Sequence, residues 1–257
     1  MATLRLGTAR AVTKAPFGNA EIAAAVAGAR RVLDAGCGSG RLTLALAEAG
    51  AEVTGIDTNA KQLAAARQRA EEAGVKLELL EADLNGRLPF AETAFAAVTS
   101  RLVLMATDDP VATLRELGRV LEPNGRLVTV LWAAPDENPW FSVPREAIGA
   151  VLGTVRAAFA RAFGRLGDPA EAAAVHEAAG LHDVAARVLR ECTIASDAEE
   201  HWAALSSENG HFRRVAAELS EAERSALVAY LEERLAPYRE GDRLLLPRTQ
   251  VLVTARR

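Results

Sequence analysis

Three glycines at alternate positions, Gly36, Gly38 and Gly40, follow an apolar run that contains Asp34. Glycine lets the main chain turn sharply after a strand and lie close against a bound molecule, where a β-carbon would intrude. Glycines between a strand and a helix are typical of nucleotide-binding sites. The dinucleotide-binding fingerprint has glycine or alanine where this chain has Arg41, so the spacing disfavours a dinucleotide.

Two aspartates, Asp57 and Asp83, stand at the ends of the next two β-rich runs. The carboxyl ends of parallel strands meet at one edge of a sheet, so both acids are expected beside the glycines. The Asp57 carboxylate can accept hydrogen bonds from both ribose hydroxyls, in NAD as well as in other adenosine ligands. An acceptor at Asp83, beside the N–H of Leu84, matches the amino group and a ring nitrogen of adenine. Together these residues predict an adenosyl cofactor.

Between residues 30 and 133, short β-rich runs alternate with helical patterns, which indicates stacked βαβ units and a parallel sheet. Apolar residues at helical spacing predict helices at 41–49, 60–73 and 110–121. Two capping-box patterns, Ser196 with Glu199 and Ser220 with Glu223, predict the starts of further helices. Seven strands are expected, at residues 31–35, 52–57, 76–82, 94–100, 125–132, 183–193 and 244–255.

We expect a single domain over residues 1–257, because the chain has no internal repeat and no linker long enough to separate a second domain. The pattern changes after residue 133, where Pro135, Asn138 and Pro139 interrupt it. The expected parts are an N-terminal helical cap at 1–29, a cofactor-binding core at 30–133, helical covers over an acceptor site at 134–167 and 196–240, and last strands at 183–193 and 243–257.

Motifs across residues 32–127 resemble, in order, those of class I S-adenosylmethionine-dependent methyltransferases, in particular the small-molecule type 11 group, which is ubiquinone-methyltransferase-like. They are Val-Leu-Asp-Ala-Gly-Cys-Gly-Ser-Gly at 32–40, Gly-Ile-Asp at 55–57, Ala-Asp-Leu at 82–84 followed by Leu-Pro-Phe at 88–90, Phe-Ala-Ala-Val-Thr-Ser at 95–100, and Leu-Glu-Pro-Asn-Gly-Arg-Leu at 121–127. The resemblance implies an α/β, Rossmann-like seven-stranded sheet with helices on both faces and helical lid insertions. Its strand order would be 3-2-1-4-5-7-6, with the seventh strand antiparallel.

The resemblance also implies S-adenosyl-L-methionine as the methyl donor and S-adenosyl-L-homocysteine as its product. By this likeness Gly36, Gly38 and Gly40 would approach the methionine part of the donor. Asp34 would bond nearby to the amino group of that part, and Ser100 would contribute main chain near the sulfonium.

The adenosine part of the donor is assigned by the same resemblance. Asp57 would hold the ribose, and Thr58 and Gln62, at the start of the next helix, would flank the adenine or the sugar. Asp83 and Leu84 would bind the edge of the adenine ring.

The acceptor is expected to be a small lipophilic or aromatic molecule, because aromatic residues concentrate in the cover segments of a chain otherwise poor in them. Many relatives carry histidine where this chain has Met105, which suggests an apolar pocket floor. Arg101 can pair with an anionic substrate or brace a loop. Further candidate pocket residues, of which the aromatic ones can equally be core packing, are Trp132, Trp140, Phe141, Phe159, Phe163 and Glu208.

Among the four histidines, His211 is the candidate for proton transfer or for orienting the acceptor, because it lies in a cover segment. His176, on an expected surface helix, His182 and His201 are expected to be structural or solvated. No histidine, cysteine and carboxylate cluster has the spacing of a metal site, so we expect no metal.

A formal net charge of -4 offers no basic surface for a polyanion, which disfavours nucleic acid and anionic membranes as partners. The two cysteines form neither a CxxC pair nor a disulfide framework, and the sequence has no leader-like or membrane-length apolar run. We therefore expect a cytoplasmic protein, monomeric or homodimeric, whose partner is a small-molecule acceptor.

The sequence-based hypothesis is a methyltransferase that methylates O, N or C of a small metabolite by in-line displacement, with positioning supplying much of the rate. A protein that binds the cofactor without turnover is the alternative, because no general base is clear from the sequence. A nicotinamide-dependent oxidoreductase is less favoured, because Arg41 and the Asp83 motif argue against it.

Overall fold

The computed structural model describes residues 17–153 and 162–257, which divide into two compact units. The sheet unit contains residues 17–133, 164–189 and 250–257, and the helical unit contains residues 134–153, 162–163 and 190–249. Each unit buries apolar side chains of its own, such as Leu33 and Leu127 in the first and Phe212 and Leu231 in the second. Most of the predicted covers fall in the helical unit, and their covering role stays a prediction.

The sheet has the order β3-β2-β1-β4-β5-β8-β6, with β7 paired to β8, which makes eight strands in the described part of the chain. The strands are β1 (Arg31–Ala35), β2 (Glu52–Asp57), β3 (Glu78–Glu81), β4 (Phe95–Arg101), β5 (Leu121–Trp132), β6 (His182–Ala195), β7 (Arg239–Glu240) and β8 (Arg243–Arg256). The pairs from β3 to β5 are parallel, and β8 runs antiparallel to β5. The predicted order is confirmed, with β8 as the seventh long strand. The sequence missed β7 because two residues show no period.

The fifth strand departs most from its predicted bounds. It begins at Leu121 instead of residue 125, because the main chain pairs on both sides of the turn that contains Asn124. Asn124 has a φ of 62°, and the register with β4 shifts between Phe95 and Ala97. The turn that the sequence predicts before the strand therefore lies within the strand, as a bulge.

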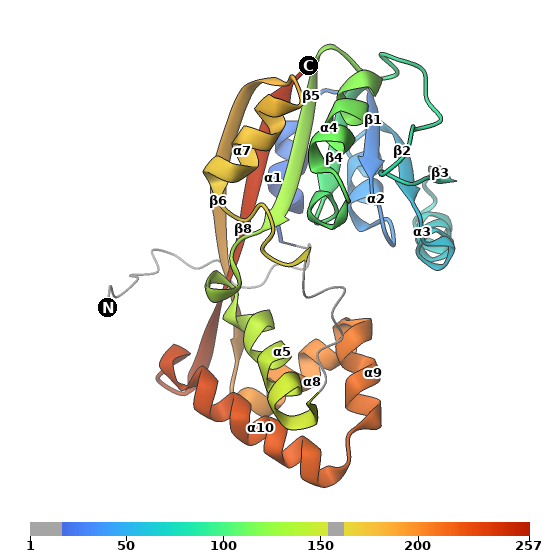
Figure 1. Ribbon diagram of the computed structural model, residues 1–257. Coiled ribbons are helices and arrows are strands. Elements are labelled where there is room, and N and C mark those ends of the chain that lie inside the picture. The colour runs from blue at the N-terminus through green and yellow to red at the C-terminus, as the bar shows by residue number, and fades with distance from the viewer. Residues whose placement is uncertain (1–16, 154–161) are drawn as a thin grey trace. The chain divides into compact units, whose positions relative to one another are not determined.

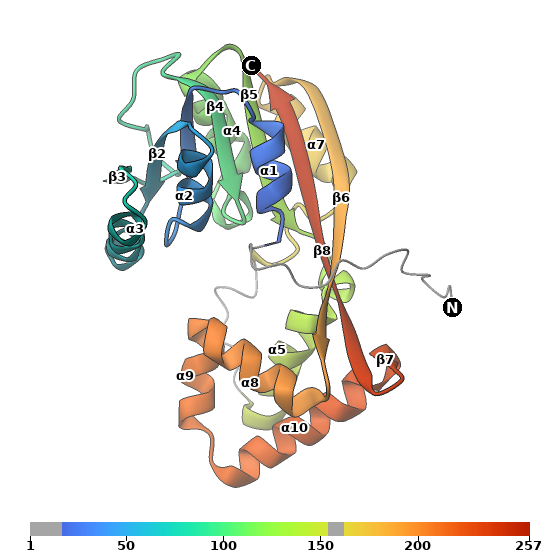
Figure 2. The same ribbon diagram turned by 180° about the vertical axis from the view of Figure 1, so that it is seen from behind.

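Helices lie on both faces of the sheet, as predicted. Figures 1 and 2 show α1 and α2 on one face and α4 and α7 on the other, while α3 packs beside α2 and β3. The helices of this unit are α1 (Asn19–Ala25), α2 (Arg41–Glu48), α3 (Ala60–Ala73), the short 3-10 helix η1 (Leu104–Ala106), α4 (Pro110–Val120) and α7 (Pro169–Ala178).

The predicted N-terminal cap is described only from residue 17 onward, and residues 1–16 lie outside the described residues. Within it, α1 buries Ile22 completely. The Arg126 guanidinium, from β5, donates to Ala25 O and Ala27 O at 3.0 and 2.9 Å. A cation at the last carbonyls of a helix stabilises its C-terminus, so the strand holds this helix in place.

The helical unit is built from the 3-10 helices η2 (Pro135–Glu137) and η3 (Ala236–Tyr238) and from α5 (Pro139–Leu152), α8 (Ala198–Glu208), α9 (Gly210–Glu218) and α10 (Glu221–Leu235). The predicted capping box of Ser220 with Glu223 is confirmed. The predicted pair of Ser196 with Glu199 is wrong, because Asp197 caps α8 instead and accepts from Glu200 N at 2.8 Å. A carboxylate one residue later serves the same free amides.

Candidate functional site

The glycine loop between β1 and α2 is anchored on β2. Gly36 N–H donates to Ile56 O at 2.8 Å, and Gly38 N–H donates to Asp57 Oδ2 at 2.9 Å. The φ angles of Gly36 and Gly38 are 78° and 53°, in the region that favours glycine. A β-carbon on Gly36 would lie 2.4 Å from Val103 Cγ2, whereas one on Gly38 would meet no atom within 4 Å. The loop therefore packs tightly at Gly36 and leaves open space at Gly38, where a ligand can approach the main chain.

Asp57 joins two loops at the end of β2. Its Oδ1 accepts from Asn59 N at 2.8 Å, while its Oδ2 accepts from Gly38 N. Asn59 in turn caps α3, accepting from the amides of Lys61 and Gln62. A half-buried carboxylate that accepts one hydrogen bond on each oxygen keeps lone pairs for ligand hydroxyls. The bond to Gly38 spans 19 residues, so no local pattern could have indicated it.

Asp34 lies beneath the loop, 1% exposed. Its carboxylate accepts from Thr43 Oγ1 at 2.7 Å and from Thr99 Oγ1 at 3.0 Å. Burial raises the pKa of Asp34, and the two hydroxyls and the positive charge of Arg101 oppose that shift. The structure thus adds Thr43 and Thr99 to the donor-site neighbourhood, which the sequence analysis missed. A contact of Asp34 with an amino group stays a prediction.

A cavity of about 220 Å³ opens at the carboxyl ends of β1 and β2. It is smaller than a pocket for a whole drug-sized ligand, so it suits one part of a larger molecule. Five of the predicted donor-site residues line this cavity, namely Gly36, Asp57, Thr58, Asp83 and Leu84. The remaining lining residues, which the sequence analysis did not name, are Ala82, Asn85, Val103, Ala106 and Thr107.

Asn85 connects the two walls of this cavity. Asp83 Oδ1 accepts from Asn85 N at 2.9 Å and from Asn85 Nδ2 at 3.1 Å. On the opposite side, Asn85 Oδ1 accepts from Asp108 N at 2.8 Å. Because the same amide side chain bonds both segments, the loop that carries Asp83 is linked to the segment after η1.

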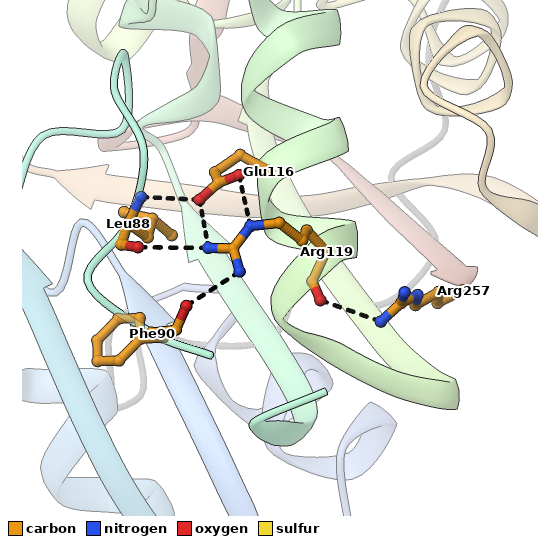
Figure 3. Close-up of polar contacts among 5 residues, drawn as sticks. All are labelled: Leu88, Phe90, Glu116, Arg119 and Arg257. Atoms are coloured by element: carbon orange, nitrogen blue, oxygen red, sulfur yellow. Dashed lines mark hydrogen bonds and ion pairs between the residues drawn. The ribbon is translucent and has the colours of Figure 1, made fainter. Parts of the chain in front are cut away.

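Helix α4 holds the loop after Asp83 through an ion pair, which Figure 3 shows. Glu116 Oε1 accepts from Leu88 N at 2.7 Å, and the Arg119 guanidinium donates to Phe90 O at 3.0 Å and Leu88 O at 3.3 Å. Glu116 and Arg119 pair at 2.6 Å. The hydrogen bond from Arg119 holds the pKa of Glu116 below its usual range. Arg257 donates to Arg119 O at 3.0 Å, so the chain's last residue joins the same network.

Arg165 holds the other cavity wall. Its guanidinium donates to Thr107 O at 2.6 Å, and to Met105 O and Asp108 O, each at 3.3 Å. These carbonyls follow or belong to η1, whose last residue, Ala106, lines the cavity. A planar cation with several N–H groups suits such a fan of acceptors. No local sequence signal indicates the contacts of Arg165 with Thr107 or of Glu116 with Leu88, because each joins residues about 30 positions apart or more.

The other predicted donor-site residues do not line this cavity. Gly40 opens α2, with a φ of 75°, and Gln62 lies exposed in the first turn of α3. Ser100 is buried, and its Oγ finds no hydrogen-bond partner within the described ranges.

Burial raises the pKa of the Cys37 thiol to about 12, which leaves it protonated at neutral pH and unsuited to nucleophilic chemistry.

Three predicted acceptor residues belong to the sheet unit. The Arg101 guanidinium donates to Phe17 O at 3.2 and 2.9 Å, so it braces the segment before α1. Met105 is 4% exposed within η1, and Trp132, 7% exposed, ends β5 opposite Gln250. Of the two roles predicted for Arg101, the structure therefore shows the bracing of a neighbouring segment.

The other aromatic candidates form a ring cluster in the helical unit. Phe141 stacks on Phe163 at 4.7 Å between ring centroids and meets Phe212 edge-on at 5.2 Å. Trp140 lies 5.3 Å from Phe141, and Trp202 lies 5.8 Å from Phe212. The candidates predicted from the sequence did not include Trp202 and Phe212, because helical spacing alone does not distinguish them from ordinary core residues.

His211 lines a second cavity, of about 380 Å³, in the helical unit. Its ring lies 5.5 Å from that of Phe212, and its amide donates to Asn209 Oδ1 at 2.9 Å. Glu208 is the last residue of α8. Phe159 lies outside the described residues.

The expectation that His176 lies on a surface helix is wrong, because it is fully buried on α7. Its Nδ1 lies 2.6 Å from Ala172 O and its Nε2 2.9 Å from Thr129 Oγ1. A carbonyl can only accept, so Nδ1 carries the proton and Thr129 donates to Nε2. His201 is also buried and bonds Trp140 O at 2.7 Å, whereas His182 is exposed. Burial lowers the pKa of His176 and of His201, which favours their neutral forms.

Two kinds of feature are absent from residues 17–153 and 162–257. These residues contain no group of three or more histidine, cysteine, aspartate or glutamate side chains placed to hold a metal ion. None of their helices combines the length and apolar character needed to cross a membrane.

Residues 33–129 match the sequence profile of a family described as "Methyltransferase domain". A demethylmenaquinone methyltransferase from Thermus thermophilus is 41% identical over 125 residues, which are 48% of this chain and 56% of that protein. The chain spans about half the length of the curated relatives it matches.

Solved structures share the fold at low sequence identity. The YcgJ protein from Bacillus subtilis has a TM-score of 0.61 at 19% identity, over 93% of this chain and 97% of that one. The [4+2]-cyclase SpnF has a TM-score of 0.55 at 20% identity, over 93% and 80% of the two chains. Together with the profile match and the sheet order, these likenesses confirm the expected resemblance. Residues 33–129 are thus similar to the methyltransferase-domain family, and the fold is that of the class I S-adenosylmethionine-dependent methyltransferases.

Proposed function

We propose that this protein is an S-adenosylmethionine-dependent methyltransferase that acts on a small molecule. The observation that carries the proposal is the cavity at the sheet edge, around which five residues assigned to the donor from the motifs gather. The family match of residues 33–129 and the methyltransferase relatives support the same activity.

The residues at this edge fit an adenosyl cofactor. Gly38, which has open space where a β-carbon would stand, lets the donor approach the main chain. Asp57 accepts the ribose hydroxyls, and Asp83 with Leu84 bonds the edge of the adenine. When bound, S-adenosylmethionine supplies an electrophilic methyl group attached to a good leaving group. The cavity walls are held by α4 and by Arg165, so the site is preorganised for binding.

The acceptor is a lipophilic or aromatic metabolite in this proposal, methylated on O, N or C. The demethylmenaquinone methyltransferase relative is consistent with a quinone-type molecule. Trp132 and Met105, both in the sheet unit, supply apolar contact. Because the leaving group is good, proximity and orientation provide much of the rate, and a base matters only for a protonated acceptor.

A cofactor-binding protein without methyl transfer is the second candidate. The fold alone does not decide the reaction, since the [4+2]-cyclase SpnF shares it. Met105 places an apolar side chain where the family resemblance implies a histidine, which removes a polar group from the expected acceptor site.

Calorimetry of the full chain with S-adenosylhomocysteine and S-adenosylmethionine tests the donor site. We expect binding of both and none of NAD or NADP. Properly folded protein that binds neither would refute the proposal. Incubation with S-adenosylmethionine and a panel of phenols, hydroquinones and amines then separates the two candidates, because binding without any methylated product would favour the second.

A further inference from the structure

The helical unit contains a cavity of about 380 Å³, within the usual range for small-molecule sites. Ile148 and Leu152 of α5 form one apolar wall, and Val215 of α9 contributes to another. His211 and Arg214, also on α9, bring polar groups to the same space. Apolar walls with few polar groups are typical of sites for organic molecules.

The arginines of this unit differ sharply in their partners. Most form an ion pair or donate to a carbonyl, and these are Arg190, Arg213, Arg224, Arg234, Arg239, Arg243 and Arg248. Arg145 and Arg214 make no hydrogen bond or ion pair anywhere in residues 17–153 and 162–257. The two exceptions therefore carry positive charge that no described carboxylate neutralises.

Arg145 is the more unusual of the two, because it is half-buried. Its guanidinium lies 6.0 Å from the centroid of the Phe141 ring, a weak cation–π contact. Burial lowers the pKa of Arg145, yet a guanidinium stays charged in proteins. A partly desolvated cation without a carboxylate is unfavourable unless an anion reaches it.

Arg145 lies on α5 one helical turn before Ile148, which lines the cavity, although Arg145 itself is not among the described lining residues. Residues three and seven positions apart share a helix face, so Arg145 lies on the stripe that carries Ile148 and Leu152. Arg214, on α9, lines the cavity itself. Two unpaired guanidinium groups thus belong to the two helices that form the apolar space.

Glu218 is the acidic residue among the described residues that line the cavity. It lies four positions after Arg214 on α9, but no ion pair forms between them. Arg214 and Glu218 carry opposite charges within the described lining, so the unpaired Arg145 beside it adds one net positive charge. The cavity therefore favours an anion over a neutral or cationic ligand.

We propose that this cavity binds an amphipathic organic anion, with an apolar or aromatic body between α5 and α9 and an acidic group at Arg145 and Arg214. Guanidinium groups recognise carboxylate and phosphate oxygens in pairs, so either acid meets the chemistry of the site. Binding of this anion does not depend on the proposed function.

Calorimetry of the full chain with three probes of matched body tests the inference: 2-naphthoate, 2-naphthyl phosphate and the neutral 2-naphthalenemethanol. We expect at least one acid to bind at least tenfold more tightly than the alcohol, and the better acid identifies the anionic group. In Arg145→Gln and Arg214→Gln the preference should fall to threefold or less. Arg224→Gln, which breaks an exposed ion pair with Glu199, should keep it.

Equal affinity for acids and alcohol, no binding of any probe at millimolar concentration, or a preference that survives both cavity variants would overturn the inference. Thermal unfolding by circular dichroism verifies that each variant is folded. S-adenosylhomocysteine titrated into the same samples separates the two proposals. Its binding without acid preference would refute the anion site alone, and acid preference without its binding would keep the anion site and refute the methyltransferase.

Discussion

The cavity of the sheet unit and the cavity of the helical unit differ in what builds their walls. The first is made by loops at strand ends, with main-chain amides bonded to Asp57 and carbonyls bonded to Arg119 and Arg165. The second is made by side chains on two helices, and its polar groups include Arg214, which has no hydrogen-bond or ion-pair partner in the described chain. A site built from the main chain needs particular residues at particular spacings, whereas a site between helices needs only shape and charge.

This difference accounts for where the family is recognised. The matching profile covers residues 33–129, all within the sheet unit. Turns and strand ends admit few residue types, so they leave a motif. A helix face tolerates many apolar residues of suitable volume, so the helical unit leaves only an amphipathic pattern.

The largest effect is expected in the helical unit. Phe212→Ala removes a fully buried ring that contacts Phe141 and Trp202, which should cost about 3–5 kcal/mol of unfolding free energy. Denaturant titration followed by tryptophan fluorescence measures the loss. If the two cavities are functionally separate, the folded variant binds S-adenosylhomocysteine within about twofold of wild type. A parallel loss of that affinity would mean that the helical unit shapes the donor site.

Asp57→Ala should weaken S-adenosylhomocysteine binding at least tenfold, since charged hydrogen bonds contribute about 1.5–3 kcal/mol. The substitution also releases Gly38 and Asn59, whose amides the carboxylate holds. Calorimetry measures the change. Glu52→Ala, at the other end of the same strand in an exposed pair with Arg30, is the matched control and should leave affinity unaltered. Unchanged affinity in Asp57→Ala would remove this residue from the donor site.

Gly36→Ala and Gly38→Ala test how main chain builds the first cavity. Both residues have positive φ, so both alanines carry a strain of about 1 kcal/mol. Gly36→Ala adds a clash with Val103, for a further loss of about 1–3 kcal/mol on thermal unfolding. Gly38→Ala should instead impair S-adenosylhomocysteine binding with little further loss of stability. The reverse ranking would show that the open space at Gly38 is not used by the donor.

Glu116→Gln should lower stability by about 1–2 kcal/mol, because the pair with Arg119 loses its charge. The pKa of Glu116 is depressed in the fold, so its stabilisation is complete above the usual glutamate value of about 4.3 and is lost as pH falls through the lower folded value. Wild type should therefore lose unfolding free energy more steeply than the variant below about pH 4.3. Glu122→Gln, in an exposed pair with Arg31, is the control. Identical acid slopes would contradict the role of the pair.

The family resemblance implied the sheet order, and the amino-acid sequence was sufficient for most strand positions, the glycine loop and the acids at the strand ends. Those features are local, because strand and helix periods, caps and turns depend on residues a few positions apart. Asp57 and Asp83 followed from the end positions of parallel strands, which the βαβ pattern already implies. The family resemblance rests on the same local motifs, and the profile match confirms it.

Tertiary structure decided which distant groups meet. Three contacts join residues 19 to 60 positions apart: the hydrogen bond of Gly38 to Asp57, that of Thr129 to the buried His176, and that of Arg165 to the carbonyl of Met105. The pairing of one arginine and the isolation of another likewise depend on which helices pack together. Such contacts arise from the packing of complete elements, and no spacing within a single element encodes them.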